Sequence, residues 1–206
     1  MKAYRHRELL AEGQRLRGKT HLDMGALDPS QLSENGRLVH ATDGQSWHLM
    51  TLDESGQVLP CLRYLVRANS VPFSELTIAH SALAQSATWG PTELRQARAQ
   101  GCSYVEMGGW AITEALRRST EALRMMVTAF ALAEALGGAL GIINANLESF
   151  SAAILRRIGG TKFNGGTTWN CRRTLKPNID RSRLKSFALI RRSLILAIRS
   201  GCKSAK

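Results

Sequence analysis

The sequence lacks the features that mark membrane-spanning and secreted proteins. No uninterrupted apolar run approaches the roughly 20 residues that a bilayer-spanning helix needs. The first residues, MKAYRHR, are not followed by an apolar core and a small-residue cleavage site, so no signal peptide is expected. There is also no internal repeat and no low-complexity segment. These absences predict a cytoplasmic globular protein.

Cysteine and histidine are few and scattered. The four cysteines form no C-x-x-C pair, and the five histidines add no spacing that is typical of a zinc site. No metal and no permanently bound cofactor are therefore expected. The cysteines are interpreted as small, mostly buried residues: Cys61, Cys102, Cys171 and Cys202.

Acidic residues are almost missing from the end of the chain. From Arg172 onward there are 11 Lys and Arg residues against one carboxylate, Asp180, within a chain of net charge +12. The body before it is nearly neutral. Residues 182–199 are predicted to form a basic amphipathic helix inside a C-terminal segment of residues 177–206. Such a segment attracts an anionic partner: nucleic acid, a membrane surface or an acidic protein.

The first half of the chain predicts a helix followed by a hairpin. Residues 5–19 place leucines near helical spacing among charged residues. Residues 37–52 have strand character, residues 53–56 are typical of a turn, and residues 58–66 predict the second strand. Pro60 favours an edge position or a bulge in that second strand.

The second half alternates strands and helices. Strands are predicted over residues 103–112 and 139–144, with a last strand or strand pair over residues 162–172. Helices are predicted over residues 115–136 and 148–158. This order favours one α/β (α+β) domain over residues 1–176, with a mixed central sheet flanked by helices.

The most informative pattern is the strand SYVEMGGWAI, residues 103–112. A glycine pair inside a strand indicates a bulge or a close approach by a ligand or another backbone. Glu106 lies two residues before that pair, and a buried carboxylate needs a partner or the border of a solvated cleft. The following helix would present its free N–H groups near the strand's end, which is a natural phosphate site. Its start carries Arg117, Arg118, Ser119 and Thr120.

Each of these features has a simpler interpretation. Glu106 would serve equally as an ion-paired structural carboxylate, and Arg117 and Arg118 as a solvated first helical turn. In combination, the bulged strand, the carboxylate and the basic helix start are typical of a cleft for an acyl donor.

With these residues the chain resembles the acetyltransferase (GNAT) superfamily, and within it the acyl-homoserine-lactone synthases and long-chain N-acyl amino acid synthases. The resemblance covers roughly residues 5–165. It rests on the order of three motifs: G-x-V-x-x-C-x-R-Y-L at residues 56–65, E-M-G-G-W-A-I at 106–112 and L-R-R-I-G-G at 155–160. The resemblance implies a GNAT-like fold and an N-acyltransferase activity.

The chain departs from the lactone synthases where these bind their acceptor. Their strand has E-x-x-R, whereas here Gly109 stands three residues after Glu106. Their two aspartates three apart correspond to His40 and Asp43. These differences favour a different amine, such as an amino acid, over S-adenosylmethionine. Tyrosine as that amino acid is taken from the resemblance alone. The coenzyme A loop also lacks its glycines at residues 117–122, which favours acyl carrier protein, with acyl-CoA as the second option.

The resemblance implies a role for each site residue. Glu106 would take a proton from the attacking amine. His40, Asp43 and Arg63 would lie on the acceptor side, with Arg63 either holding the substrate carboxylate or paired internally. The acyl-phosphopantetheine arm of the donor would contact the strand and the helix start: Met107, Gly108, Gly109, Trp110, Ala111, Ile112, Arg117, Arg118, Ser119 and Thr120.

The sequence therefore predicts an enzyme that moves a long-chain fatty acyl group from acyl carrier protein to the α-amine of an amino acid. A lactone-type autoinducer synthase and an acetyl-CoA-dependent N-acetyltransferase remain alternatives. A nucleic-acid-binding module is a remote one, because the body of the chain is nearly neutral and no nucleic acid is expected. The basic C-terminal segment would dock the acidic carrier protein, rest on an anionic membrane, or be a solvated terminal helix.

Overall fold

The computed structural model describes residues 2–66, 71–80, 92, 95, 99, 103–143, 145, 151–158, 160–162, 169–171 and 195–199. The chain forms two compact units. The first combines Met1–Tyr64, Gly108–Ala129 and Ser193–Lys206, and the second combines Leu65–Met107 and Phe130–Arg192. Strand β3 (Ser103–Ile112) contributes its first half to the second unit and its second half to the first.

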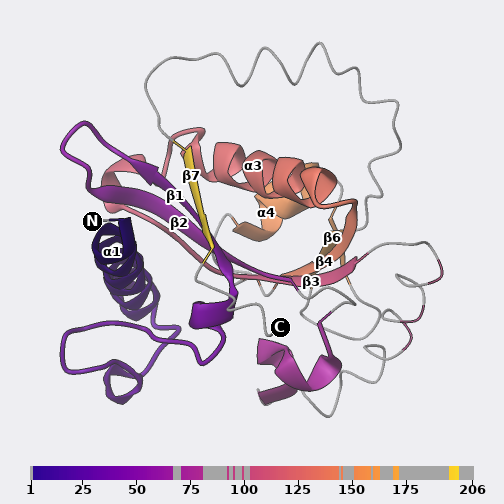
Figure 1. Ribbon diagram of the computed structural model, residues 1–206, viewed down its shortest axis with the longest axis horizontal. Coiled ribbons are helices and arrows are strands. Elements are labelled where there is room, and N and C mark those ends of the chain that lie inside the picture. Colours follow the sequence, from indigo (N-terminus) through magenta and orange to yellow (C-terminus); the bar gives the residue numbers. More distant parts are fainter. Residues whose placement is uncertain are drawn as a thin grey trace. The chain divides into compact units, whose positions relative to one another are not determined.

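The first unit contains helix α1 (Lys2–Asp23) and an antiparallel hairpin of β1 (Trp47–Leu52) and β2 (Val58–Leu65). The predicted turn closes the hairpin, where the Gly56 N–H donates to the Asp53 carbonyl over 3.0 Å. A further strand, β7 (Ile195–Arg199), pairs antiparallel with β1. The strand order in this unit is β3-β2-β1-β7 (Figure 1).

Helix α1 packs one face on this part of the sheet (Figure 1). Its buried residues Leu9, Gly13, Arg17 and Thr20 recur at helical spacing. Leu9 joins an apolar cluster with one residue of β1, two of β2 and one of β3: Met50, Val58, Cys61 and Ala111. All residues of β1 from 48 to 51 are buried, so both faces of this strand are covered.

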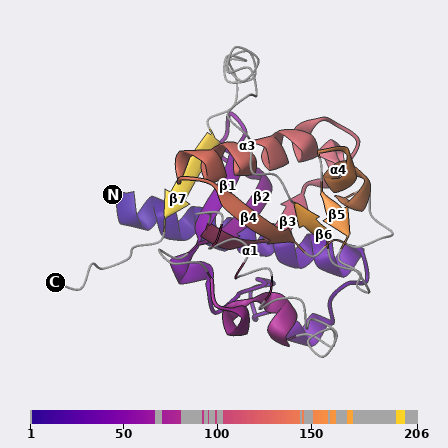
Figure 2. The same ribbon diagram turned by 90° about the vertical axis from the view of Figure 1, so that its right-hand side faces the viewer.

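The second unit orders its strands β5-β6-β4-β3. Strand β4 (Ala139–Ile143) runs parallel to β3, whereas β6 (Trp169–Cys171) is antiparallel to β4 and β5 (Thr161–Lys162) is antiparallel to β6 (Figure 2). The sheet is therefore mixed, as predicted. Helix α4 (Ser151–Arg157) belongs to this unit, and helix α3 (Glu121–Ala135) has residues in both units.

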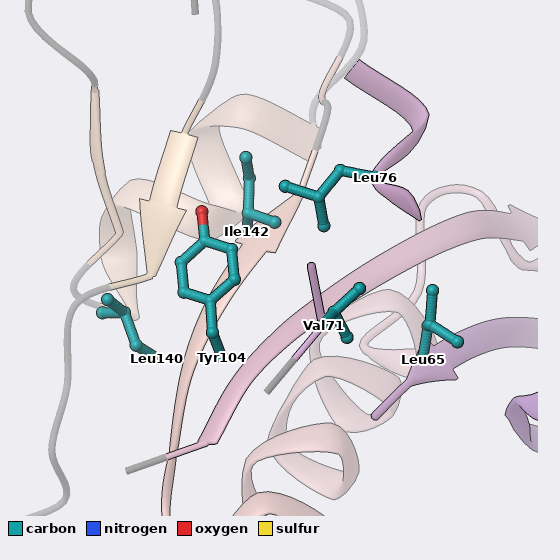
Figure 3. Close-up of a cluster of buried hydrophobic side chains, with 6 residues drawn as sticks. All are labelled: Leu65, Val71, Leu76, Tyr104, Leu140 and Ile142. Carbon is teal, nitrogen blue, oxygen red and sulfur yellow. The ribbon is translucent and has the colours of Figure 1, made fainter. Parts of the chain in front are cut away.

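A buried apolar cluster forms the core of the second unit on one face of β3 and β4 (Figure 3). Tyr104 of β3 lies in register with Leu140 of β4, and Glu106 with Ile142. Because alternate residues of a strand share a face, Glu106 lies on the same face as Tyr104. The cluster comprises Leu65, Val71, Leu76, Tyr104, Leu140 and Ile142.

Three predicted elements need correction. Residues 37–46 are not part of β1, because the Thr-Asp-Gly-Gln segment forms a 3₁₀ helix at Asp43–Gln45. Helix α3 begins at Glu121 rather than at residue 115. The Ser119 hydroxyl accepts the Glu121 N–H over 3.2 Å, and serine competes well for such helix-start positions.

The third correction concerns the C-terminal helix predicted over residues 182–199. Residues 195–199 form strand β7 instead, and residues 182–194 lie outside the described part of the chain. The β-branched Ile195 and Ile198 favour a strand, and the edge of β1 offers backbone partners. Pro60 is not on an edge strand, because β2 lies between β1 and β3. The other alternative, a bulge near Pro60, holds, because the β1–β2 register shifts between Met50, paired with Cys61, and Leu52, paired with Val58.

Candidate active site

Polar side chains gather in the interior of the first unit, around the 3₁₀ helix at Asp43–Gln45. We call this group the polar cluster; each of its members is at most 5% exposed. They come from α1, the 43–45 segment, β1 and β2: Gln14, Arg17, Asp43, His48 and Arg63. Buried polar groups are costly unless they are hydrogen-bonded, and each of these side chains makes at least one hydrogen bond, although the Nε atoms of Arg17 and Arg63 have no hydrogen-bond partner among the described residues.

The central contact of the cluster is a two-point ion pair between Arg17 and Asp43. Arg17 Nη1 donates to Asp43 Oδ1 over 3.0 Å, and Nη2 donates to Oδ2 over 2.6 Å. The Gln14 side-chain amide and the His40 N–H also donate to Oδ2, over 2.8 and 3.1 Å. Burial alone would raise the pKa of Asp43, but these donors and the Arg17 charge lower it to about 2.

Arg17 lies directly against the glycine pair of β3. Gly109 adopts a left-handed φ of +59°, and a Cβ atom placed there would lie 2.5 Å from Arg17 Cδ and 3.0 Å from Nη1. Glycine at this position therefore adopts the left-handed φ without steric strain, and its lack of a side chain leaves room for the guanidinium. The space that a side chain at residue 109 would need is thus taken by an arginine from α1.

Two histidines border the cluster. The buried His48 ring bonds to the Asp43 carbonyl over 2.9 Å through Nε2, which must carry the proton because a carbonyl only accepts. Burial is the main cause that lowers the pKa of His48. Burial, followed by the charges of Arg63 and Arg17, lowers the pKa of the half-buried His40 to about 4. Both rings are therefore neutral at pH 7, and His40 is too weak a base to take a proton from an amine.

Arg63 lies on β2 opposite His48 of β1, and it is 2% exposed. Its Nη1 donates to the Thr42 hydroxyl, next to Asp43 in the chain. The structure thus brings together the three residues predicted for the acceptor side, His40, Asp43 and Arg63, within the first unit.

Glu106 is buried in the second unit and is 4% exposed. Its Oε1 accepts the Thr77 hydroxyl over 2.6 Å, and its Oε2 accepts the Thr77 backbone N–H. Of the two expectations for this carboxylate, a partner or the border of a cleft, the structure shows a partner.

Of the predicted donor-side residues of β3, Met107 is the last one paired with β4, and the others lie beyond that pairing. The β3–β4 register runs from Ser103 to Met107, and residues 108–112 lie in the first unit, where the Thr113 N–H donates to Leu59 of β2 over 2.9 Å. The Trp110 indole N–H is buried and has no hydrogen-bond partner among the described residues. A buried donor of this kind is costly unless a ligand or water accepts from it.

The segment before α3 exposes all four residues predicted to meet the donor phosphate: Arg117, Arg118, Ser119 and Thr120. Arg117 makes a surface ion pair with Asp23 at the end of α1, over 3.3 Å. The Ser119 hydroxyl caps the helix start. Glu121, in the first turn, is paired with Arg124.

Sequence reasoning missed Gln14, Arg17, His48 and Thr77. Arg17 had a usable signal, because it falls on the Leu9–Gly13–Thr20 face of α1 instead of the charged face.

Within the described ranges, no three metal-ligating side chains come together, and every helix is too short or too polar to cross a membrane.

No protein-family model and no curated protein sequence matches the chain. Among solved structures it is similar to FeeM, an N-acyl amino acid synthase from uncultured soil microbes, at a TM-score of 0.51 and 16% identity, over 77% of this chain and 86% of that one. TofI, in a ternary complex with an inhibitor and MTA, matches at a TM-score of 0.46 and 15% identity, over 79% and 81%. At such identity the likeness is one of fold. The chain therefore has the predicted acetyltransferase-type α/β fold, in the form found in the synthase FeeM.

Proposed function

We propose that this protein is an N-acyltransferase that moves a long-chain fatty acyl group from a carrier-borne thioester to the α-amine of an amino acid. The observation that carries the proposal is strand β3, which joins a buried carboxylate, Glu106, to a glycine with left-handed φ, Gly109, within the fold of an N-acyl amino acid synthase.

The proposed reaction needs one proton acceptor. The α-amine of the acceptor is protonated at neutral pH and must lose a proton before its nitrogen attacks the thioester carbonyl. Glu106 takes that proton, directly or through a water. The new N–C bond forms and a tetrahedral oxyanion develops near a backbone N–H beside Gly109. As this intermediate collapses, the C–S bond breaks, and the departing sulfur takes the remaining excess proton of the nitrogen to leave as the carrier thiol. No acyl-enzyme is needed, and burial raises the pKa of the Cys61 thiol to about 12, which makes it a poor nucleophile.

The donor arm is proposed to lie along residues 107–112 of β3. The buried Trp110 indole N–H supports this, because an amide or thioester oxygen of the pantetheine would supply the acceptor that the described residues lack. The phosphate would meet Arg117, Arg118, Ser119 and Thr120 at the start of α3. Acyl carrier protein is the proposed carrier, because this segment has no glycine-rich loop to hold a pyrophosphate.

The acceptor is proposed to bind at the polar cluster. Arg63 would hold the amino-acid carboxylate, since a guanidinium offers two parallel donors to it. The carboxylate oxygens of Asp43 already accept hydrogen bonds from Arg17 and Gln14. Asp43 would therefore not contact the acceptor itself; its bonds would keep the 43–45 segment in place. The basic segment from Arg172 is proposed to dock the acidic carrier; most of it lies outside the described residues.

The direct test is product analysis with purified protein. Hexadecanoyl-loaded acyl carrier protein and, in parallel, hexadecanoyl-CoA are incubated with the twenty amino acids, and the extract is examined by mass spectrometry. We expect an N-hexadecanoyl amino acid, formed faster from the carrier-borne donor. A third arm with S-adenosylmethionine and a fourth with acetyl-CoA detect the lactone-synthase and acetyltransferase alternatives.

Two variants make the test specific. Glu106→Gln should lower turnover by about a hundredfold or more, the usual contribution of a general base, with little change in donor affinity. Glu121→Gln, at the start of α3, is the matched control and should retain turnover. Absence of any acylated amine in all four arms refutes the proposed function, and full turnover by Glu106→Gln removes Glu106 from the mechanism.

A further inference from the structure

Thr77 occupies both oxygens of the Glu106 carboxylate. Its hydroxyl donates to Oε1 over 2.6 Å, and its own backbone N–H donates to Oε2. Two donors from one residue, one on each oxygen, fix the plane of the carboxylate as well as its position. Hydrogen bonds to an ionised oxygen are also shorter and stronger than neutral ones.

The segment that carries Thr77 is anchored to the core of the second unit. The preceding residue, Leu76, is fully buried in the apolar cluster of the second unit, beside Ile142 (Figure 3). Upstream, the Val71 N–H donates to the Tyr104 carbonyl of β3 over 2.9 Å. Residues 71–80 are thus tied to the same strand that carries Glu106, two residues after Tyr104.

A hydrogen bond also holds the C-terminal end of this segment, at His80. Thr77 begins the 3₁₀ helix Thr77–His80, and the His80 ring bonds to the Ser74 carbonyl over 2.8 Å. This links the second 3₁₀ helix to the first, Phe73–Glu75. Thr77 is exposed whereas Glu106 is buried, so the threonine forms the outer side of their contact.

We propose that Thr77 is a positioning residue for Glu106, holding the carboxylate in the orientation from which it takes the proton of the attacking amine. This inference rests on the proposed function. A carboxylate that rotated freely would spend part of its time with neither oxygen toward the amine, and proton transfer depends on that alignment. If Thr77 had only a structural role, its hydrogen bonds to Glu106 would hold residues 77–80 in place and would not affect proton transfer.

Kinetics of three variants separate the two roles. Thr77→Val removes the hydroxyl at nearly constant shape, and we expect kcat with hexadecanoyl-loaded carrier protein to fall about tenfold or more, the scale of one hydrogen bond to a charged group. The KM values should stay within about twofold. Thr77→Ser restores the hydroxyl and should restore kcat. Thr128→Val, which removes a hydroxyl bond to the Arg124 carbonyl in α3, is the matched control and should leave kcat unchanged.

Failure of this inference is distinguishable from failure of the proposed function. If Glu106→Gln abolishes turnover while folded Thr77→Val keeps the wild-type kcat, the positioning role is wrong and the proposed function stands. If Thr77→Val and Thr77→Ser lose kcat equally, the hydroxyl is not the cause and the inference is also overturned.

A measurement without substrate tests the contact itself. In ¹H–¹⁵N NMR, the Thr77 amide proton should resonate downfield because it donates to a carboxylate, and Glu106→Gln should move it upfield. The Glu121→Gln control should leave it in place. An amide resonance that does not respond to Glu106→Gln overturns the inference whatever the activity.

Discussion

Arg17 Cδ lies 2.5 Å from the point that a Cβ atom of Gly109 would occupy, so the side chain from α1 and the glycine of β3 share one space. The pair is a close contact between the N-terminal helix and the second half of β3. It also places the buried guanidinium of Arg17 beside Gly109, one of the residues proposed to bind the donor.

Gly109→Ala should destabilise the protein strongly. The methyl group meets Arg17, and the left-handed backbone adds strain, so we expect a loss of roughly 2–4 kcal/mol from overpacking and αL strain together. Gly25→Ala is the matched control, because Gly25 has a φ of +63° with nothing within 4 Å of the added atom. Urea unfolding measures both, and equal losses would show that contact with Arg17 contributes nothing.

Arg17→Met should leave the Asp43 carboxylate buried without its ion-pair partner. Breaking a buried pair from one side costs roughly 3–5 kcal/mol. Lys19→Met breaks only the exposed pair with Asp23 and should cost less than about 1 kcal/mol. The double variant Arg17→Met with Asp43→Asn should recover part of the loss. Additive losses in this double-mutant cycle would contradict the coupling.

Acid should destabilise the fold in two steps. Burial and two nearby guanidinium groups lower the pKa of His40 to about 4 from 6.5, so the unfolded chain binds a proton first and stability falls between about pH 6.5 and 4. Asp43, with a pKa of about 2 against 3.8, removes further stability below about pH 4. Thermal unfolding across this range measures both steps. His40→Gln should make the upper step shallower, and His48, whose pKa is also lowered by burial, contributes to what remains. An unchanged slope would exclude His40 as a source of this step.

Trp110→Phe removes the indole N–H while retaining an aromatic ring. If the donor substrate accepts that hydrogen bond, the KM for hexadecanoyl-loaded carrier protein should rise by roughly three- to tenfold, the scale of one neutral hydrogen bond, while kcat changes little. The KM for the acceptor amino acid serves as the internal control. A higher acceptor KM with an unchanged donor KM would move Trp110 to the other side of the site.

Removal of β7 should weaken the first unit. Ending the chain after Arg192 deletes the strand that pairs with five residues of β1, whereas ending it after Arg199 retains that strand. We expect a lower Tm and concentration-dependent aggregation only for the shorter chain, because an open strand edge templates association. Calorimetry and light scattering measure the two effects. Equal behaviour of both chains would mean that β7 contributes nothing to stability.

Local patterns predicted most of the fold. Strand β3 has the predicted bounds, because an apolar run with a glycine pair and a following turn has few other solutions. The prediction was wrong where tertiary partners decided the outcome. Ile195 and Ile198 fit a helical face as well as a strand, and only the edge of β1 selects the strand. Residues 37–46 were predicted to be part of a strand, but the turn-forming residues around Asp43 form a 3₁₀ helix instead.

The site was harder to predict, because its contacts span long separations in the chain. Glu106 was identified from its neighbours in sequence, but its partner Thr77 is 29 positions away. Arg17 meets Asp43 across 26 positions, and in the sequence it is one of many arginines in a charged helix. The glycine at 109 was noted as a departure from the lactone synthases. That an α1 arginine fills its space follows only from the three-dimensional packing.

Strand β7 also has a consequence for how the protein is made. Translation produces β1 long before β7, since the two strands lie near opposite ends of the sequence. Until β7 leaves the ribosome, the nascent chain carries the edge of β1 without the partner it has in the folded protein. Such an edge can recruit a strand from a neighbouring nascent chain. Slower translation of residues 53–194 should therefore lower the soluble yield, and co-expressed chaperones should restore it.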